Sequence, residues 1–380
     1  MYWLLGITIA FVAILLLEEL RLRQTRRRIP LRIVVTGTRG KSSLVRILAA
    51  GLRDREPATW GKITGDAPLL LTSDHMSVPI PRRGPARIHE QRNLLFGAAG
   101  HGIRRLVLES MAISPTIMKA EMRLIQPSLV VITNVFDDHR ETLGGDRNRQ
   151  RAAYLEALPA DCRWLSADAE LLDAAARSER YPEPLAVTTR PEGPDGDEAG
   201  VACELLNLAD AALAELGLDT ESAHAAMRAA AVGTVPPPRI VPFLDRRVRL
   251  LDGFSANDLQ SLDRLWRDWR RLLDDPVPWP VLFATRADRP LRTQQFCGWL
   301  AGRSDVAHVY VAGSHRTVAA WLLSRRGVPV SVVVEDPLAG GTESTGEIVT
   351  TDTEPEILVG VGNALGFGMQ LRETAQAAEA

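Results

Sequence analysis

The chain has 380 residues and a mass of 41.6 kDa, a length that suits two domains of ordinary size. Hydrophobic residues make up 46% of it and charged residues 24%, which excludes a disordered, collagen-like or multi-span membrane protein. The formal net charge of −2 gives no support to a general nucleic-acid binder, a class that is usually basic. Cys162, Cys203 and Cys297 are too far apart for a disulfide framework or a metal knuckle, so we interpret them as buried thiols in a reducing compartment.

The N-terminal segment is apolar. Residues 2–17 carry no charge, and a helix of this length spans roughly 24 Å at about 1.5 Å per residue. Bilayer thinning can close the gap to a hydrocarbon core of about 30 Å. The arginines follow the apolar run, at Arg21, Arg23 and 26–28, whereas a signal peptide has its positive charge first. We therefore predict a membrane anchor over residues 1–20, a single-pass protein of the cell membrane and a cytoplasmic body. The alternative is a buried N-terminal helix of the globular body.

Three apolar runs after the anchor read as buried strands. They cover residues 32–36, a stretch that ends at Glu109 and a stretch that ends at Asn134, with helix-length segments between them. Continuous apolar runs in this alternation are typical of a parallel sheet with helices on both faces. A proline- and glycine-rich surface loop at 191–199 follows. We assign these elements to a central domain over residues 30–235.

A helix pair at about 201–216 and 220–231 precedes the best candidate for an interdomain hinge, Val235 to Pro238. Beyond it the strand and helix alternation resumes in a second α/β domain over residues 239–380. We find no internal repeat. The strands expected there, and the acidic loop before the last of them, are 247–251, 280–285, 308–312, 329–333, 356–361 and the loop 335–355.

The strongest local signal is a phosphate-binding loop between the strand 32–36 and the next helix. Gly37 and Gly40 allow backbone amides to approach phosphate oxygens closely. Lys41 is predicted to reach the β- and γ-phosphates of a bound nucleotide, and Ser42 to place a hydroxyl on Mg²⁺. The motif is shortened, because Val35 stands where the common form has its first glycine. The alternative is a plain turn before a helix. The predicted nucleotide-binding residues are Thr36, Gly37, Thr38, Arg39, Gly40, Lys41, Ser42 and Ser43.

Acidic and histidine side chains follow the next two strands. Glu109 lies at a strand end, where ligands bind in parallel sheets, and its carboxylate suits a hard ion such as Mg²⁺. Asn134 is followed by Asp138 and His139 in a loop that faces the same edge, and His139 could ligate a metal or contact the γ-phosphate. The alternatives are that Glu109 neutralises a helix dipole and that His139 is a solvated loop histidine.

These three motifs together resemble the Mur ligase superfamily, which includes folylpolyglutamate synthetase. More specifically, the chain resembles the poly-γ-glutamate synthase PgsB/CapB family over almost its whole length. This resemblance implies a P-loop-containing, Mur-ligase-like central domain with a parallel sheet, a smaller C-terminal α/β domain and one N-terminal transmembrane helix. Further segments that support this resemblance are Gly84-Pro85, Glu90-Gln91, 109–112, 253–258, 286–289, 292–296 and 360–363.

The resemblance implies an ATP-dependent amide ligase that polymerises glutamate. The γ-carboxylate of glutamate or of the growing chain attacks the γ-phosphate of ATP, and an amine then attacks the acyl phosphate. It implies Lys41, Glu109 and His139 as catalytic residues, with Ser42, Glu109 and His139 on Mg²⁺ and Asn257 at the nucleotide. Arginine forks match carboxylates, so the candidates for substrate binding are Arg239, Arg286, Arg289 and Arg292.

Two departures from the Mur pattern matter. Tyr154 stands where many Mur ligases carry a carbamylated lysine, and the usual N-terminal substrate domain is missing, so we expect no nucleotide-linked peptidoglycan precursor.

The expected partners are small membrane proteins of the same synthase complex, with no nucleic acid. One alternative is a membrane-tethered GTPase switch, since Thr285 to Asp288 resembles a guanine-reading motif. Another is an inactive scaffold.

Overall fold

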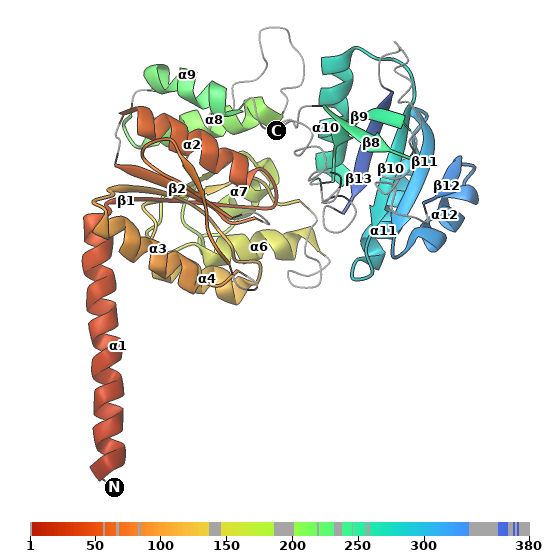
Figure 1. The fold of residues 1–380 in the computed structure, drawn as a ribbon. Helices are drawn as coiled ribbons and strands as arrows, with labels where there is room; N and C mark the ends of the chain where they lie inside the picture. Colours follow the sequence, from red (N-terminus) through yellow and green to blue (C-terminus); the bar gives the residue numbers. More distant parts are fainter. Residues whose placement is uncertain are drawn as a thin grey trace, which may run out of the picture. The chain divides into compact units, whose positions relative to one another are not determined.

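The computed structural model divides into two compact units, Met1–Thr234 and Val235–Ala380 (Figure 1). The hinge residues 235–237 and the loops 191–199 and 335–355 lie outside the residues that the structure describes. The described residues are 2–55, 58–65, 68–82, 84, 86–136, 146–185, 201–218, 220–231, 238–244, 246–254, 256, 259–333, 356–363, 368 and 371.

The first unit contains a seven-stranded sheet in the order β4-β3-β2-β5-β1-β6-β7. The strands β2, β5, β1, β6 and β7 run parallel, while β3 and β4 form an antiparallel edge. Its elements in chain order are α1 (Tyr2–Arg28), β1 (Leu31–Thr36), α2 (Lys41–Arg55), β2 (Thr59–Ile63), β3 (Leu69–Leu71), β4 (Ser77–Pro79), α3 (His89–Gly100), β5 (Arg105–Glu109), α4 (Pro115–Ile125), β6 (Leu129–Ile132), α6 (Arg147–Ala157), β7 (Trp164–Ser166), α7 (Ala169–Ala176), α8 (Val201–Glu215) and α9 (Thr220–Ala231).

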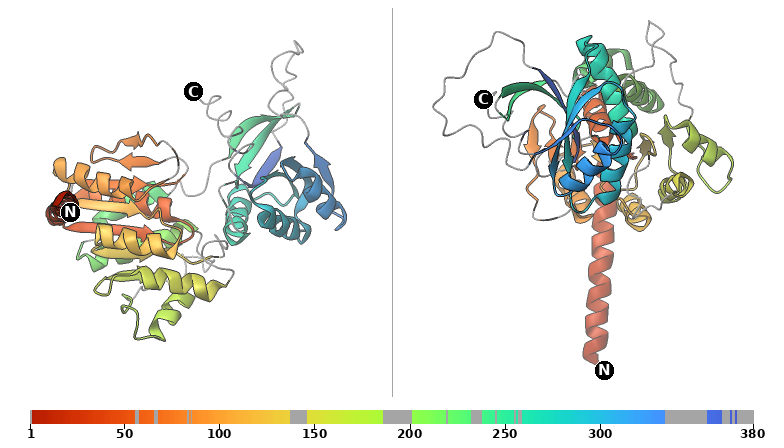
Figure 2. Two further views of the ribbon diagram at one scale, coloured as in Figure 1. Left: turned by 90° about the horizontal axis from the view of Figure 1, so that it is seen from below. Right: turned by 90° about the vertical axis from the view of Figure 1, so that its right-hand side faces the viewer.

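Helices cover both faces of this sheet, as predicted (Figures 1 and 2). Successive residues of β1 point to opposite faces, so Ile33 and Val35 pack with α2, α8 and α9. Val34 packs on the other face, with α3, α4 and α6. All three side chains are fully buried, which explains why the strand reads as a continuous apolar run rather than an alternating one.

The second unit contains a six-stranded sheet in the order β12-β11-β10-β13-β9-β8, parallel except for β8. The five strands expected from the sequence all form, within two residues of their expected ends. The edge strand β8 was missed because it contains Pro242, which cannot donate to a strand ladder. The elements are β8 (Arg239–Phe243), β9 (Arg246–Asp252), α10 (Leu259–Leu273), β10 (Trp279–Thr285), α11 (Pro290–Ala301), β11 (Val306–Gly313), α12 (Arg316–Ser324), β12 (Val330–Val332) and β13 (Ile357–Gly362).

Helix α1 is longer than the apolar run and has 27 residues. The apolar part is exposed along its length, and no residue of its most hydrophobic window is buried, so it is not a core helix. By length and composition it can cross a membrane. Its last turns are fixed to the first unit, because Glu18 pairs with Arg92 of α3 and Arg26 Nε donates to the Leu124 carbonyl at 3.0 Å.

Two of the cysteines are free and buried, as predicted. Burial raises the pKa of the Cys162 thiol to about 11, and it raises the pKa of Cys297 to about 11 as well. Both thiols are therefore protonated at neutral pH and are poor nucleophiles. The side chain of Cys203 lies outside the described residues.

Candidate active site

The phosphate loop lies where β1 ends and α2 begins. Gly37 has a φ of +120° and Gly40 a φ of +79°, conformations that favour glycine. A Cβ atom on Gly37 would overlap the hydroxyl of Thr133, so the loop also needs a bare backbone there. The ammonium of Lys41 bends back over the loop and donates to the carbonyls of Gly37 at 2.8 Å and Thr38 at 3.1 Å. Lys41 is the first residue of α2, so the lysine of the motif stands at the start of the helix, as predicted.

Asn134 holds the loop from the neighbouring strand end. Its side chain accepts a hydrogen bond from the Arg39 N–H at 2.9 Å and donates one to the Arg39 carbonyl at 3.2 Å. Its backbone carbonyl accepts from the Thr38 N–H at 2.9 Å. The asparagine noted in the sequence therefore supports the phosphate loop, a role that sequence reasoning had not assigned to it.

Glu109 lies beside the loop at the end of β5. Its register partner on β1 is Val35, which brings the carboxylate level with the start of the loop. The Ser42 hydroxyl donates to Glu109 Oε2 at 2.9 Å, and the Thr64 N–H donates to the same oxygen at 2.8 Å. The structure therefore brings together two residues that lie 67 positions apart in the sequence and that were predicted to share a metal ion.

The oxygen donors of Ser42 and Glu109 suit a hard divalent cation. Magnesium is commonly held by one or two protein oxygens, with waters and substrate phosphates completing its shell. Within the described residues, no three His, Cys, Asp or Glu side chains form a closed metal cage. The first turn of α2 carries no acidic residue, so its positive end remains favourable for phosphate.

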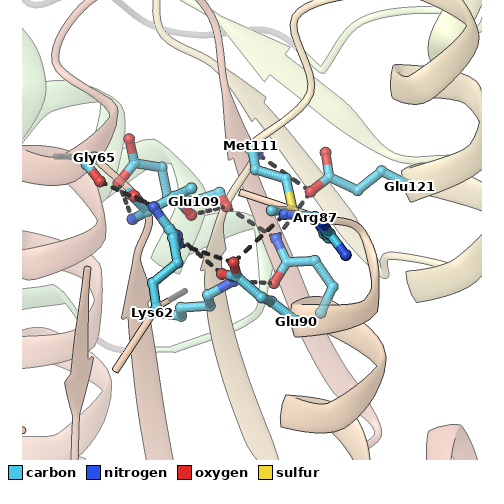
Figure 3. A network of polar contacts seen from close by, with 10 residues as sticks. Lys62, Gly65, Arg87, Glu90, Glu109, Met111 and Glu121 are labelled. Atoms are coloured by element: carbon cyan, nitrogen blue, oxygen red, sulfur yellow. Dashed lines mark hydrogen bonds and ion pairs between the residues drawn. The ribbon is translucent and has the colours of Figure 1, made fainter. Parts of the chain in front are cut away.

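A buried polar network contacts the backbone of Glu109 (Figure 3). Lys62 on β2 is 1% exposed, and its ammonium donates to Glu90 Oε2 at 3.2 Å and Gln91 Oε1 at 3.1 Å. Gln91 Nε2 donates to the Glu109 carbonyl at 3.1 Å and to Glu121 Oε1 at 2.8 Å. The network links β2, α3, β5 and α4, and sequence reasoning found none of these contacts.

Burial and ion pairing act in opposite directions on the charges of this network. Burial lowers the pKa of Lys62 below its ordinary value, although Glu90 and Glu121 favour the charged form. Burial alone would raise the pKa of Glu90, but hydrogen bonds and charge from Arg82 and Lys62 outweigh it and leave that pKa lowered. Glu90 therefore stays ionised beside Lys62 at neutral pH.

The four predicted substrate arginines lie at the carboxyl edge of the second sheet. Arg239 begins β8 and pairs with Leu250, close to the end of β9. Arg286 follows β10, but both branches of its guanidinium bind Asp288, at 2.9 and 2.8 Å. Arg292 donates to Asn363 Oδ1 at 3.2 Å, beyond the end of β13, and Arg289 precedes the first residue of α11. Two further candidates, His139 and Asn257, lie outside the described residues.

Comparison with known proteins finds similarity to CapB proteins. A family model described as the poly-gamma-glutamate synthase CapB C-terminal domain matches residues 239–378. The chain is 25% identical over 396 residues to PGA synthase CapB of Bacillus subtilis (strain 168), with 98% of this chain and 97% of that protein covered. It is 28% identical over 325 residues to the capsule biosynthesis protein CapB of Bacillus anthracis, covering 78% of this chain and 66% of that protein. Over nearly its whole length the chain is similar to a CapB protein, and its residues 239–378 match the CapB C-terminal domain.

Solved structures agree with a Mur-ligase-like fold for this chain. The MurF ligase of Thermotoga maritima in complex with ADP matches with a TM-score of 0.59 at 15% identity, over 96% of this chain and 85% of that one. A bifunctional folylpolyglutamate synthase/dihydrofolate synthase of Yersinia pestis c092, complexed with AMPPNP and Mn ion, matches with a TM-score of 0.57 at 14% identity, over 94% and 93%.

The similarity to CapB proteins, together with this fold, supports an ATP-dependent ligase that forms amide bonds. The enzyme class predicted from the sequence is thereby confirmed. The GTPase switch receives no support from any of these relatives.

Proposed function

We propose that the chain is a membrane-anchored ligase that activates the γ-carboxyl group of glutamate with ATP and joins it to the amine of another glutamate. The product is a poly-γ-glutamate chain, in keeping with the PGA synthase named among its relatives. The observation that carries the proposal is the pairing of Ser42 and Glu109, 2.9 Å apart, directly beside a phosphate loop.

In this phosphoryl transfer the protein mainly has to position the reactants and neutralise phosphate charge, and it forms no covalent bond to them. A carboxylate oxygen forms a bond to the γ-phosphorus of ATP, and the bond from that phosphorus to the β-γ bridging oxygen breaks to release ADP. The attacking amine then displaces phosphate from the acyl phosphate and loses a proton. Lys41 turns from the loop carbonyls to the β- and γ-phosphates, while the glycines of the loop admit the phosphate oxygens.

Ser42 and Glu109 would hold Mg²⁺, which neutralises charge on the phosphates when it is bound. His139 remains a proposed third ligand, and Asn257 a proposed nucleotide contact. The acidic substrate needs cations, and the arginines at the second sheet edge supply them. Arg239, Arg286, Arg289 and Arg292 are the proposed residues, and Asp288 lies beside two of them, at 2.9 and 2.8 Å from Arg286 and at 3.9 Å from Arg289.

Helix α1 is the proposed membrane anchor. The apolar part of α1 spans the membrane, and the arginines that follow it keep the catalytic body in the cytoplasm. Small membrane proteins of the same synthase complex are the proposed partners of its exposed apolar surface.

Hydroxylamine trapping tests this function. Membranes carrying the chain and its presumed partners are supplied with ATP, Mg²⁺, glutamate and hydroxylamine. We expect a glutamate-dependent hydroxamate and an equal amount of ADP, because hydroxylamine intercepts the activated carboxyl group. The appearance of AMP would indicate an acyl adenylate instead. Glutamate-independent hydrolysis that prefers GTP, with no hydroxamate, would contradict the proposal.

A further inference from the structure

We propose that Lys62 and Gln91 are positioning residues for Glu109, and that they set the affinity of the site for a divalent cation without touching the cation. The inference rests on the proposed function, since it takes Glu109 as the metal-binding carboxylate. It is carried by the contacts that fix the strand end and the turn after it, all of them within the first unit.

The backbone of Glu109 lies at the last register pair between β5 and β1, so its carbonyl needs partners beyond that pairing. Gln91 Nε2 donates to it at 3.1 Å and Thr64 Oγ1 at 3.0 Å. The next two residues are held by Glu121, which is fully buried and accepts from the Ser110 hydroxyl and from the Met111 N–H. The direction of the Glu109 side chain therefore depends on α3 and α4.

Lys62 fixes which way the Gln91 amide faces. An ammonium group can only donate, so the end of Gln91 that meets it at 3.1 Å must be the oxygen. The amide nitrogen is then directed at two acceptors, the Glu109 carbonyl and Glu121 Oε1. A reversed amide would place its N–H groups against the ammonium and its oxygen against both acceptors. Lys62, buried beside Glu90, thus sets the orientation of one of the two side chains that donate to the Glu109 carbonyl (Figure 3).

The ion pair with Glu90 does not by itself account for Lys62. Arg82 already binds both oxygens of Glu90, with two bonds of 2.9 Å. Glu90 would therefore keep a strong bidentate partner without the lysine. Lys62 supplies, in addition, the donor to Gln91 Oε1 and positive charge close to the buried Glu121.

The test compares Lys62→Met and Gln91→Met in the full chain with Lys119→Met as the matched control. Lys119 is a half-exposed lysine that pairs with Glu156 at 3.0 Å, and among the described residues it makes no hydrogen bond or ion pair with Glu109, Lys62 or Gln91. Binding of Mn²⁺ in the presence of ADP is measured from the electron paramagnetic resonance signal of the free ion. Thermal unfolding of each variant is followed in parallel. Gln91→Met keeps the Lys62–Glu90 ion pair, so it carries the test if Lys62→Met fails to fold.

We expect the Mn²⁺ dissociation constant to rise about 10–100-fold in both variants, the usual effect of losing a partner behind a metal ligand. The double variant should bind Mn²⁺ no more weakly than the weaker single variant, because both residues act through one bond. Lys119→Met should match the wild type. Folded variants with lowered stability but a wild-type dissociation constant would reduce the network to a structural role and overturn the inference. A wild-type chain that binds no Mn²⁺ with ADP would instead contradict the proposed function.

Discussion

Replacement of Lys41 by alanine is expected to lower turnover by at least about 10²-fold, the usual loss when one preorganised charge or donor is removed from a reacting group. In the structure its ammonium donates to two carbonyls of the loop, at 2.8 and 3.1 Å, which places the charge at the turn proposed to hold the phosphates. These two bonds are part-buried and come from a charged donor, so their loss costs about 1.5–3 kcal/mol of stability each. Hydroxamate formation and thermal unfolding, measured on the same preparation, separate the two effects.

Lys119→Ala is the control for this variant, because it removes a lysine from an ion pair on α4 rather than from the loop. It should retain wild-type turnover. A Lys41→Ala enzyme with full turnover would remove the loop from the nucleotide site. An unfolded variant would show instead that the lysine is needed for the loop itself.

Glu109→Gln is expected to raise the Mg²⁺ concentration for half-maximal activity about 10–100-fold and to slow turnover. The amide keeps one oxygen, which can still accept from Ser42 and from the Thr64 N–H, so the shape of the strand end is conserved. The negative charge and the second oxygen ligand are lost, and both favour a hard cation. A magnesium titration of glutamate-dependent activity measures the shift.

The matched control is Glu156→Gln, which removes a carboxylate that pairs with Lys119 and Arg180 far along the chain from Glu109. Its magnesium titration should coincide with that of the wild type. An unchanged titration in Glu109→Gln would exclude this carboxylate from the metal site. A loss of folding in Glu109→Gln alone would mean that its charge serves the network rather than the cation.

The sequence predicted those parts of the site that depend on neighbouring residues. A phosphate loop is a local motif, so Lys41 and Ser42 could be assigned from the strand before them and the helix after them. Glu109 could be placed because carboxyl ends of parallel strands meet at one edge. The distance between Ser42 and Glu109 then confirmed a juxtaposition that the topology had required.

The parts that were missed depend on contacts distant in sequence. Strand β2 was not predicted, because Gly61 and Lys62 interrupt its apolar pattern. The structure explains both: a Cβ on Gly61 would crowd Leu71 and Ala49, and Lys62 is buried against partners 28 and 29 residues away. Thr64 follows this strand, so its bonds to Glu109 were missed for the same reason.

Transfer of oxygen from glutamate to phosphate tests whether the ligase activates glutamate as an acyl phosphate. Glutamate labelled with ¹⁸O in its carboxyl groups is incubated with membranes carrying the chain, its presumed partners, ATP and Mg²⁺, and the released phosphate is analysed by mass. Activation through an acyl phosphate predicts one labelled oxygen in each phosphate released during amide formation, because that oxygen leaves with the phosphate. Unlabelled phosphate, or label in AMP, would contradict the account.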